Sequence, residues 1–186
     1  MAAIETTSIP LGFSAPSFCL PDGRSGEMVR SEDLFGQRPT LVVFMCNHCP
    51  FVVHVLPSLV ELAATYKELG VQTVAISSND TVRYPQDGLE HMAALAGSMD
   101  FSFPYLYDAS QEVARAYDAA CTPDFSIFDA QGQCVYRGQF DGSRPGNEVP
   151  VTGNDVRRVL DLLIAGQPVP SDGQLPSIGC NIKWKG

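Results

Sequence analysis

The chain has 186 residues, of which 45% are hydrophobic and 18% charged, and its formal net charge is −9. These values are typical of one globular domain with a substantial core. The acidic balance argues against nucleic-acid binding, because phosphates require a basic surface. No apolar run is long enough to cross a bilayer, and no basic segment precedes an apolar one at the N-terminus. We therefore expect a single cytoplasmic domain over residues 1–186, with neither a nucleic-acid nor a membrane partner.

Hydrophobic periodicity predicts strands and helices that alternate along the chain. Continuous apolar runs indicate strands buried on both faces of a sheet, and apolar residues at helical spacing indicate amphipathic helices. In chain order we expect a hairpin with strands near 18–20 and 28–29, a helical turn at 31–36, a strand at 40–45, a helix at 50–69, a strand at 71–77, a helix at 86–99, a strand at 105–107, a helix at 111–119, a hairpin with strands at 124–129 and 133–138, a helix at 155–165 and a C-terminal tail at 166–186. This order predicts an α/β fold, with a central mixed β-sheet covered by helices on both faces.

Some helix ends and faces can be predicted in detail. Ser31 is expected to cap the helical turn, and Thr152 or Asn154 the last helix, because short polar side chains accept the free N–H groups of a first turn. Polar residues recur at steps of three and four along the helix at 50–69. His54 belongs to this solvent-facing stripe, and Val53 is expected on the buried side.

Two of the six cysteines form a close pair, Cys46 and Cys49, between a predicted strand and a predicted helix. An even number of cysteines can indicate a secreted disulfide framework, but this chain is long and its cysteines are sparse. In a reducing compartment a Cys-x-x-Cys pair is more often catalytic or metal-binding than structural. The six are Cys19, Cys46, Cys49, Cys121, Cys134 and Cys180.

The residues after the pair predict which thiol attacks. Proline is favoured at the first position of a helix, and the residue before a proline avoids the helical region. Pro50 is therefore expected to begin the helix and Cys49 to cap it. The free N–H groups and the helix dipole would stabilise a Cys49 thiolate. We expect Cys49 to be the nucleophile and Cys46 the resolving thiol, the reverse of the usual order.

Two other interpretations of the pair stay open. Both thiols can be inert packing residues, since free cysteine is often buried. A zinc site needs further ligands, which His48, His54 or Cys180 would have to supply because there is no second Cys-x-x-Cys. The strand–loop–helix setting favours redox chemistry, so we expect neither a metal nor a cofactor.

Several motifs link the chain to a known family. Pro57 lies eight residues after Cys49, where thioredoxins have a kinking proline after their nucleophile. Thr122-Pro123 precedes an apolar strand, as does the cis proline that packs against the cysteines of that superfamily. Cys49-Pro50 is similar to the peroxidatic Cys-Pro of peroxiredoxins. Residues 12–18 and 179–185 are also similar to segments of peroxiredoxin-like proteins.

The chain thus resembles the thioredoxin superfamily, and more specifically the peroxiredoxin-like branch of the alkyl hydroperoxide reductase/thiol-specific antioxidant family. The resemblance extends from about Gly12 to the end of the chain. It implies a thioredoxin-like fold with an N-terminal β-hairpin extension. It also implies an antioxidant thiol enzyme in which Cys46 and Cys49 react and Pro50, Thr122 and Pro123 support them.

The departures from the family pattern concern the reacting groups. Peroxiredoxins have a threonine three residues before the peroxidatic cysteine, and here that position is Cys46. They also have an arginine that stabilises the thiolate; Arg115 and Arg137 are the candidates, and neither matches the motif. At the positions of the thioredoxin tryptophan and second cysteine, this chain has His48 and Val52.

The resemblance leaves two reactions open. In the first, the Cys49 thiolate attacks a protein or small-molecule disulfide, and Cys46 resolves the mixed disulfide. In the second, a peroxide oxidises Cys49 to a sulfenic acid that condenses with Cys46. Both end at one Cys46–Cys49 disulfide, which a reducing thiol system would reopen. Copper carriage by proteins of this fold is a third alternative, but those carriers space their cysteines more widely and use a distant histidine, and the last histidine here is His91.

Several other residues have side chains that could take part in the chemistry. As a cation, His48 would lower the pKa of Cys49, or it is a solvated loop residue. Cys121 is an extra redox partner or, preferably, a small packing residue. Cys180 is a possible second resolving thiol. The polar loop at 137–144 lies near the site or is simply solvated. Surface exposure is expected for His91, and structural roles for Cys19 and Cys134.

Overall fold

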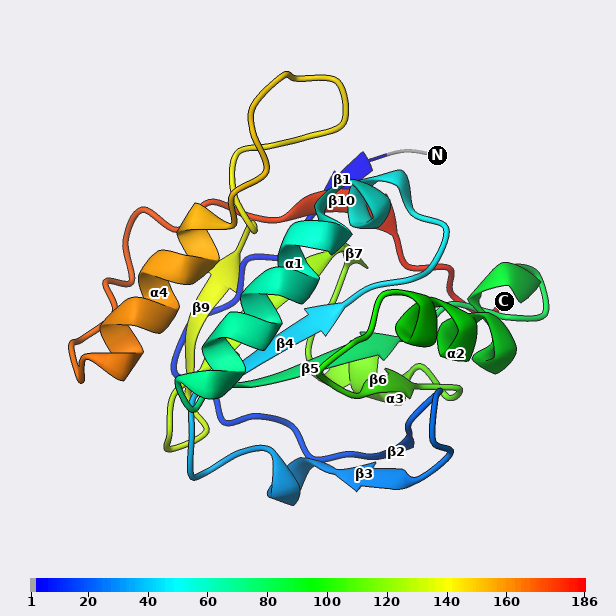
Figure 1. Cartoon of the computed structure of the whole chain (residues 1–186), viewed down its shortest axis with the longest axis horizontal. Helices are drawn as coiled ribbons and strands as arrows, with labels where there is room; N and C mark the ends of the chain where they lie inside the picture. The colour runs from blue at the N-terminus through cyan, green and yellow to red at the C-terminus, as the bar shows by residue number, and fades with distance from the viewer. Residues whose placement is uncertain (1–2) are drawn as a thin grey trace.

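The computed structural model describes residues 3–186, so residues 1–2 of the expected single domain lie outside the described residues. Its centre is a five-stranded sheet in the order β6-β5-β4-β8-β9 (Figure 1). The strands β4, β5 and β6 are parallel, and β8 and β9 are antiparallel to their neighbours. The strands are β4 (Thr40–Phe44), β5 (Gln72–Ser77), β6 (Tyr105–Tyr107), β8 (Asp124–Phe128) and β9 (Cys134–Gly138). The predicted mixed sheet is confirmed.

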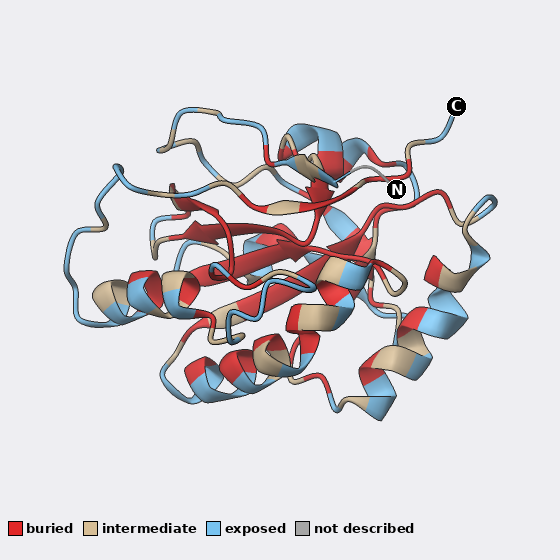
Figure 2. Ribbon diagram, turned by 90° about the horizontal axis from the view of Figure 1, so that it is seen from above, coloured by how far each residue is buried: buried red, intermediate tan, exposed pale blue. Residues whose placement is uncertain are grey.

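Helices cover both faces of this sheet, as expected. The helices α1 (Pro50–Glu68), α2 (Leu89–Ser98) and α4 (Asn154–Ile164) contribute to one apolar core, which includes Leu41 and Val43 of β4. The second core lies on the other face and receives Val42 and Phe44 of the same strand. It is closed by α3 (Glu112–Ala116) and by the N-terminal hairpin. Because both faces are buried, the strands of the sheet are buried along most of their length (Figure 2).

The N-terminal hairpin is confirmed. It consists of β2 (Cys19–Pro21) and β3 (Met28–Arg30), followed by the short helix η1 (Ser31–Asp33). Ser31 lies inside η1, so its predicted capping role is wrong; its Oγ instead accepts the Phe18 N–H at 3.1 Å.

The C-terminal segment, expected to be a tail, contains a strand. This strand, β10 (Ile178–Asn181), pairs between β1 (Ala3–Glu5) and β7 (Cys121–Thr122) in a second, three-stranded sheet. Figure 1 shows β10 in red beside β1, close to the start of α1. A Cβ atom at Gly179 would overlap the Thr122 carbonyl, so the close approach of β10 and β7 requires glycine here. The C-terminal strand β10 is thereby paired with β7, which lies near the cis proline.

Some local predictions are corrected by tertiary contacts. Gly153, with φ of 67°, occupies the position before α4, so neither Thr152 nor Asn154 is the cap residue. The Asp141 carboxylate instead accepts the N–H groups of Thr152 and Gly153, both at 2.6 Å. Val53 is 56% exposed rather than buried.

Among the helices of residues 3–186, none is long and apolar enough to span a membrane.

Candidate functional site

The predicted cap of α1 is confirmed. Cys49 is the N-cap residue, with extended backbone angles of φ −68° and ψ 122°, and Pro50 is the first residue of the helix. The Cys49 carbonyl accepts the Val53 N–H at 2.9 Å, which closes the first turn. The Cys49 sulfur therefore lies at the positive end of the helix dipole, where a thiolate is stabilised.

Both thiols of the pair contact Thr122, which belongs to β7. The Cys49 Sγ lies 3.0 Å from the Thr122 carbonyl oxygen, and the Cys46 Sγ lies 3.6 Å from the Thr122 Oγ1. The peptide bond between Thr122 and Pro123 is cis. The structure thus brings together the Cys-x-x-Cys motif and the Thr-Pro motif. Cys46 and Cys49 are both buried.

The two thiols differ in acidity. A hydrogen bond from Cys46 is the largest cause that lowers the pKa of Cys49 to about 4, and it outweighs the opposing effect of burial. The same hydrogen bond, burial and the nearby Asp87 carboxylate all raise the pKa of Cys46 above its ordinary value. Cys46 therefore keeps its proton when Cys49 ionises. Contact with a carbonyl oxygen requires a protonated thiol, so ionisation also requires the Cys49 sulfur to turn away from the Thr122 carbonyl.

A buried carboxylate, that of Asp87, has an oxygen within 4.8 Å of the Cys46 sulfur. Asp87 lies in the short helix η2 (Pro85–Asp87) and is fully buried. Its carboxylate accepts the Asn47 N–H and the Asn79 Nδ2–H, each at 2.9 Å. His48 Nδ1 lies 2.7 Å from the Asp87 Oδ2 and 4.0 Å from the Cys46 Sγ.

His48 is held as well by Tyr84, whose ring is stacked on it at 5.6 Å between centroids. With its side chain only 18% exposed, His48 is not a simply solvated loop residue. The sequence did not reveal Asp87, because no local pattern links it to a loop forty residues earlier.

A metal ion has three potential ligands here. Ligand atoms of Cys46, His48 and Asp87 all lie within 4.8 Å of one another. A tetrahedral zinc site requires a fourth ligand. His54, considered above as a zinc ligand, instead lies 2.7 Å from the Ser143 Oγ.

The third thiol at the site is Cys180. It is buried in β10, directly opposite Thr122 in the β10–β7 pairing. A hydrogen bond between the Cys180 and Cys49 thiols is among the causes that lower the pKa of Cys49, and burial followed by Cys49 raises the pKa of Cys180 to about 11.

The other cysteines lie in different settings. Cys121 is buried on β7 with its Sγ 3.7 Å from the Thr6 Oγ1, and burial raises its pKa. Cys134 is buried in the core on the other face of the sheet, where burial raises its pKa to about 12. Cys19 lies in β2, as the strand pattern predicted, and is exposed.

Neither arginine suggested by the family pattern contacts the pair. The Arg137 guanidinium donates to the carbonyls of Tyr117 and Asp118 at 2.7 and 3.1 Å. The Arg115 guanidinium lies over the Trp184 ring, 4.5 Å from its centroid.

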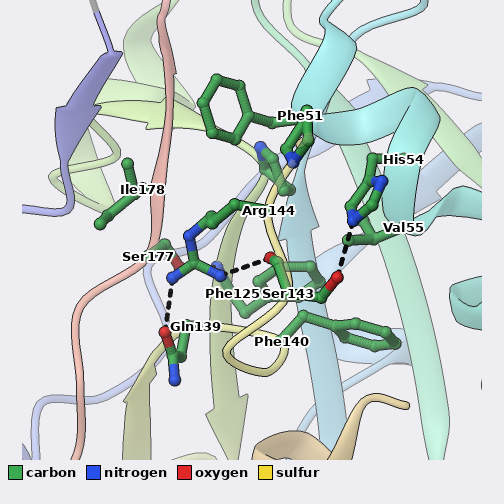
Figure 3. Close-up of a pocket in the computed structure, with 12 residues that line it drawn as sticks. Phe51, His54, Val55, Phe125, Gln139, Phe140, Ser143, Arg144, Ser177 and Ile178 are labelled. Atoms are coloured by element: carbon green, nitrogen blue, oxygen red, sulfur yellow. Dashed lines mark hydrogen bonds between the residues drawn. The ribbon is translucent and has the colours of Figure 1, made fainter. Parts of the chain in front are cut away.

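A small pocket adjoins the start of α1 (Figure 3). Phe51 and His54 line it from the helix, Ile178 from β10, Pro123 from between β7 and β8, and Arg144 from the polar loop. The loop is therefore not simply solvated. The polar stripe of the helix suggested that His54 faces solvent. In the structure His54 instead lines this pocket. His91, by contrast, is exposed on α2 as expected.

The model of the AhpC/TSA family matches residues 11–137. Over 129 residues the chain is 27% identical to the thiol-disulfide oxidoreductase ResA of Geobacillus kaustophilus, and the match covers 69% of each protein.

Solved structures extend the comparison. The chain is 55% identical to an uncharacterized conserved protein from Geobacillus kaustophilus, with a TM-score of 0.97 over 100% of this chain and 97% of that one. A putative thioredoxin from Neisseria meningitidis has a TM-score of 0.62 at 24% identity, over 80% of this chain and 88% of that one. This last likeness shows the thioredoxin-like fold.

Proposed function

Because the chain belongs to the AhpC/TSA family of the thioredoxin superfamily, we propose that it is a thiol–disulfide oxidoreductase with Cys46 and Cys49 as its redox pair. The observation that carries this proposal is the placement of two thiols at the start of α1, with Cys49 at the N-cap position and both sulfurs in contact with Thr122. The pKa of Cys49 is lowered to about 4, and that of Cys46 is raised. The similarity to a thiol-disulfide oxidoreductase supports the same reaction.

Cys49 begins the reaction and Cys46 completes it. The Cys49 thiolate attacks one sulfur of a substrate disulfide, and the other sulfur leaves as a thiolate and takes up a proton. Cys46 then loses its proton, attacks the Cys49 Sγ and releases the second substrate sulfur. The substrate gains two electrons and two protons, and Cys46 and Cys49 become a disulfide. Since both cysteines are buried, a substrate reaches them through local opening of the site.

The resolving step requires an acceptor for the Cys46 proton. The Asp87 carboxylate, with an oxygen within 4.8 Å of the Cys46 Sγ, is a suitable acceptor. His48 Nδ1 donates its hydrogen to this carboxylate at 2.7 Å and holds it in place. We assign the proton of Cys46 to this imidazole–carboxylate pair. Pro50, Thr122 and Pro123 are proposed to hold the two sulfurs in place rather than to react.

Thiol peroxidase activity is the second candidate, favoured by family membership and by the Cys49-Pro50 motif. In that reaction a peroxide oxidises Cys49 to sulfenic acid, and Cys46 displaces water to form the disulfide. Against it, Cys46 occupies the position of the peroxiredoxin threonine, and Arg115 and Arg137 are bound elsewhere. Copper carriage is a weaker candidate, since His91, the last histidine, is exposed on α2.

Rapid mixing of the reduced protein with two oxidants distinguishes these activities. We expect fast reaction with a chromogenic aromatic disulfide, and oxidation by hydrogen peroxide no faster than that of a free thiol. Cys49→Ser should abolish the reaction, whereas Cys134→Ser, which removes a buried thiol from the opposite core, should not. Rapid peroxide oxidation that is lost in Cys49→Ser would establish the peroxidase instead.

The proposed location is the cytoplasm, where a reducing thiol system would return the Cys46–Cys49 disulfide to thiols. Cell fractionation tests this location directly.

A further inference from the structure

The register of β10 directs the Cys180 side chain toward the redox pair. Cys180 is directly opposite Thr122 in the antiparallel β10–β7 pairing. Side chains of directly opposed residues lie on the same face of a sheet, with Cβ atoms about 4.5–5.5 Å apart. The Thr122 side chain on that face contacts the Cys46 sulfur at 3.6 Å. The Cys180 side chain therefore points toward Cys46 and Cys49.

The neighbouring residues of β10 support this orientation. Ile178 lies two residues before Cys180, and alternate residues of a strand share a face. Ile178 lines the pocket that adjoins the start of α1, together with Phe51 and Pro123. Gly179, between them, allows β10 to lie close against the Thr122 carbonyl. The strand is thus fixed with alternate side chains toward the helix that carries Cys49.

Cys180 also lies near the nucleophile itself. Cys180 is among the causes that lower the pKa of Cys49, and Cys49 in turn raises the pKa of Cys180. Both side chains are buried. Cys121, the other buried thiol of this small sheet, instead contacts Thr6.

We propose that Cys180 is a second resolving thiol, which forms an alternative disulfide with Cys49. This inference rests on the proposed role of Cys49 as the nucleophile. In a mixed disulfide between Cys49 and a substrate, the Cys180 thiolate attacks the Cys49 Sγ, and the substrate sulfur leaves as a thiolate that takes up a proton. The balance equals that of the Cys46 route: two protein thiols are oxidised, and the substrate disulfide is reduced to two thiols.

The two internal disulfides have different consequences for the fold. A Cys46–Cys49 bond closes a loop of four residues at the start of α1. A Cys49–Cys180 bond joins the start of α1 to the C-terminal strand β10. Attack by Cys46 on a Cys49–Cys180 bond converts the second disulfide into the first, with Cys180 leaving as the thiolate. The site is therefore a three-thiol exchange system rather than a simple pair.

The test uses the full chain with Cys46→Ser, which removes the first resolving thiol. The reduced variant is treated with oxidised glutathione, and its mass and disulfide-linked peptides are measured. We expect an intramolecular link between residues 49 and 180 without bound glutathione. Cys46→Ser with Cys180→Ser should instead stop at a stable glutathione adduct of Cys49. The matched control, Cys46→Ser with Cys121→Ser, should still form the link. An equally stable adduct in Cys46→Ser alone would overturn the proposal.

Copper–phenanthroline oxidation separates failure of this proposal from failure of the proposed function, because it links neighbouring thiols without attack on a substrate. If glutathione does not react at Cys49 at all, the proposed function fails. A 49–180 link formed by copper–phenanthroline then still supports the pairing of these two thiols, and its absence in folded Cys46→Ser overturns it. Circular dichroism establishes that each variant is folded.

Discussion

The sulfur of Cys49 lies 3.0 Å from the carbonyl oxygen of Thr122, a residue 73 positions later in the chain. This contact joins the start of α1 to the short strand β7. Because β7 is also paired with β10, the same residue places Cys46, Cys49 and Cys180 around one centre. The environment of the thiols, rather than the motif alone, sets their different acidities.

The reactivity of Cys49 should depend weakly on pH between about 5 and 8, because its pKa is about 4. We expect Cys46→Ala to raise this pKa toward the ordinary value for cysteine, since it removes the hydrogen bond from Cys46 that is the largest cause of the shift. The rate of alkylation by iodoacetamide as a function of pH measures the change. A profile for wild type with a midpoint near the ordinary cysteine value would contradict the assignment of Cys49 as a stabilised thiolate.

The same shift predicts how the stability of the reduced protein varies with pH. Between about pH 4 and the ordinary cysteine value, the unfolded chain binds a proton that Cys49 has released in the folded state. The free energy of unfolding should therefore rise with pH in this range. The contribution is lost as the pH falls through the folded pKa. Urea unfolding of reduced wild type and Cys49→Ser at pH 5 and pH 8 should show a smaller rise in the variant.

Asp87→Asn should slow the resolving step and destabilise the fold. It removes the carboxylate that faces His48 and accepts hydrogen bonds from Asn47 and Asn79. Disruption of such a buried network costs roughly 1–3 kcal/mol. His48→Gln, which leaves the carboxylate and its other donors in place, should slow resolution with less loss of stability. Urea unfolding and the lifetime of the mixed disulfide measure the two effects separately.

An unchanged mixed-disulfide lifetime in both Asp87→Asn and His48→Gln would show that the imidazole–carboxylate pair does not accept the Cys46 proton.

Thr122→Val should raise the pKa of Cys46 further, because the Thr122 hydroxyl hydrogen-bonds to Cys46 and lowers it. The resolving step should slow, and the pKa of Cys49 should also rise, because the same hydroxyl lowers it. Thr122→Ser keeps the hydroxyl and serves as the matched control. Rapid-quench measurement of the mixed disulfide separates the two steps, and equal resolving rates in Thr122→Val and wild type would contradict this role of the hydroxyl.

Gly179→Ala should weaken the pairing of β10 with β7, because the added Cβ would overlap the Thr122 carbonyl. Forcing extra atoms into a packed site costs about 1–3 kcal/mol. Gly97→Ala on α2 is the control, since a Cβ there meets no atom within 4 Å. Thermal unfolding gives the stability change, and hydrogen exchange at residues 178–181 shows whether the loss is local. Equal thermal stability and equal hydrogen exchange in the two variants would contradict the requirement for glycine at position 179.

The strand and helix order, the start of α1 and the capping position of Cys49 followed from the sequence, because each depends on residues within a few positions of one another. Apolar runs predict β4 and β5, and proline predicts the first turn of α1. Tertiary contacts nevertheless replaced one predicted helix cap. Asp141, eleven residues before Thr152, caps α4 in place of the expected side chains.

Only the tertiary structure decided what surrounds the two thiols. Asp87 reaches the loop that precedes α1, Thr122 contacts both sulfurs, and β10 places Cys180 beside Cys49. These residues are separated from the pair by tens of positions, and the pairing and packing of strands bring them close. A local pattern carries no information on such approaches, because their free energy comes from burying and hydrogen-bonding segments that meet only in the folded chain. The identity of the reacting motif is therefore a property of the sequence, and the acidity and the partners of its sulfurs are properties of the fold.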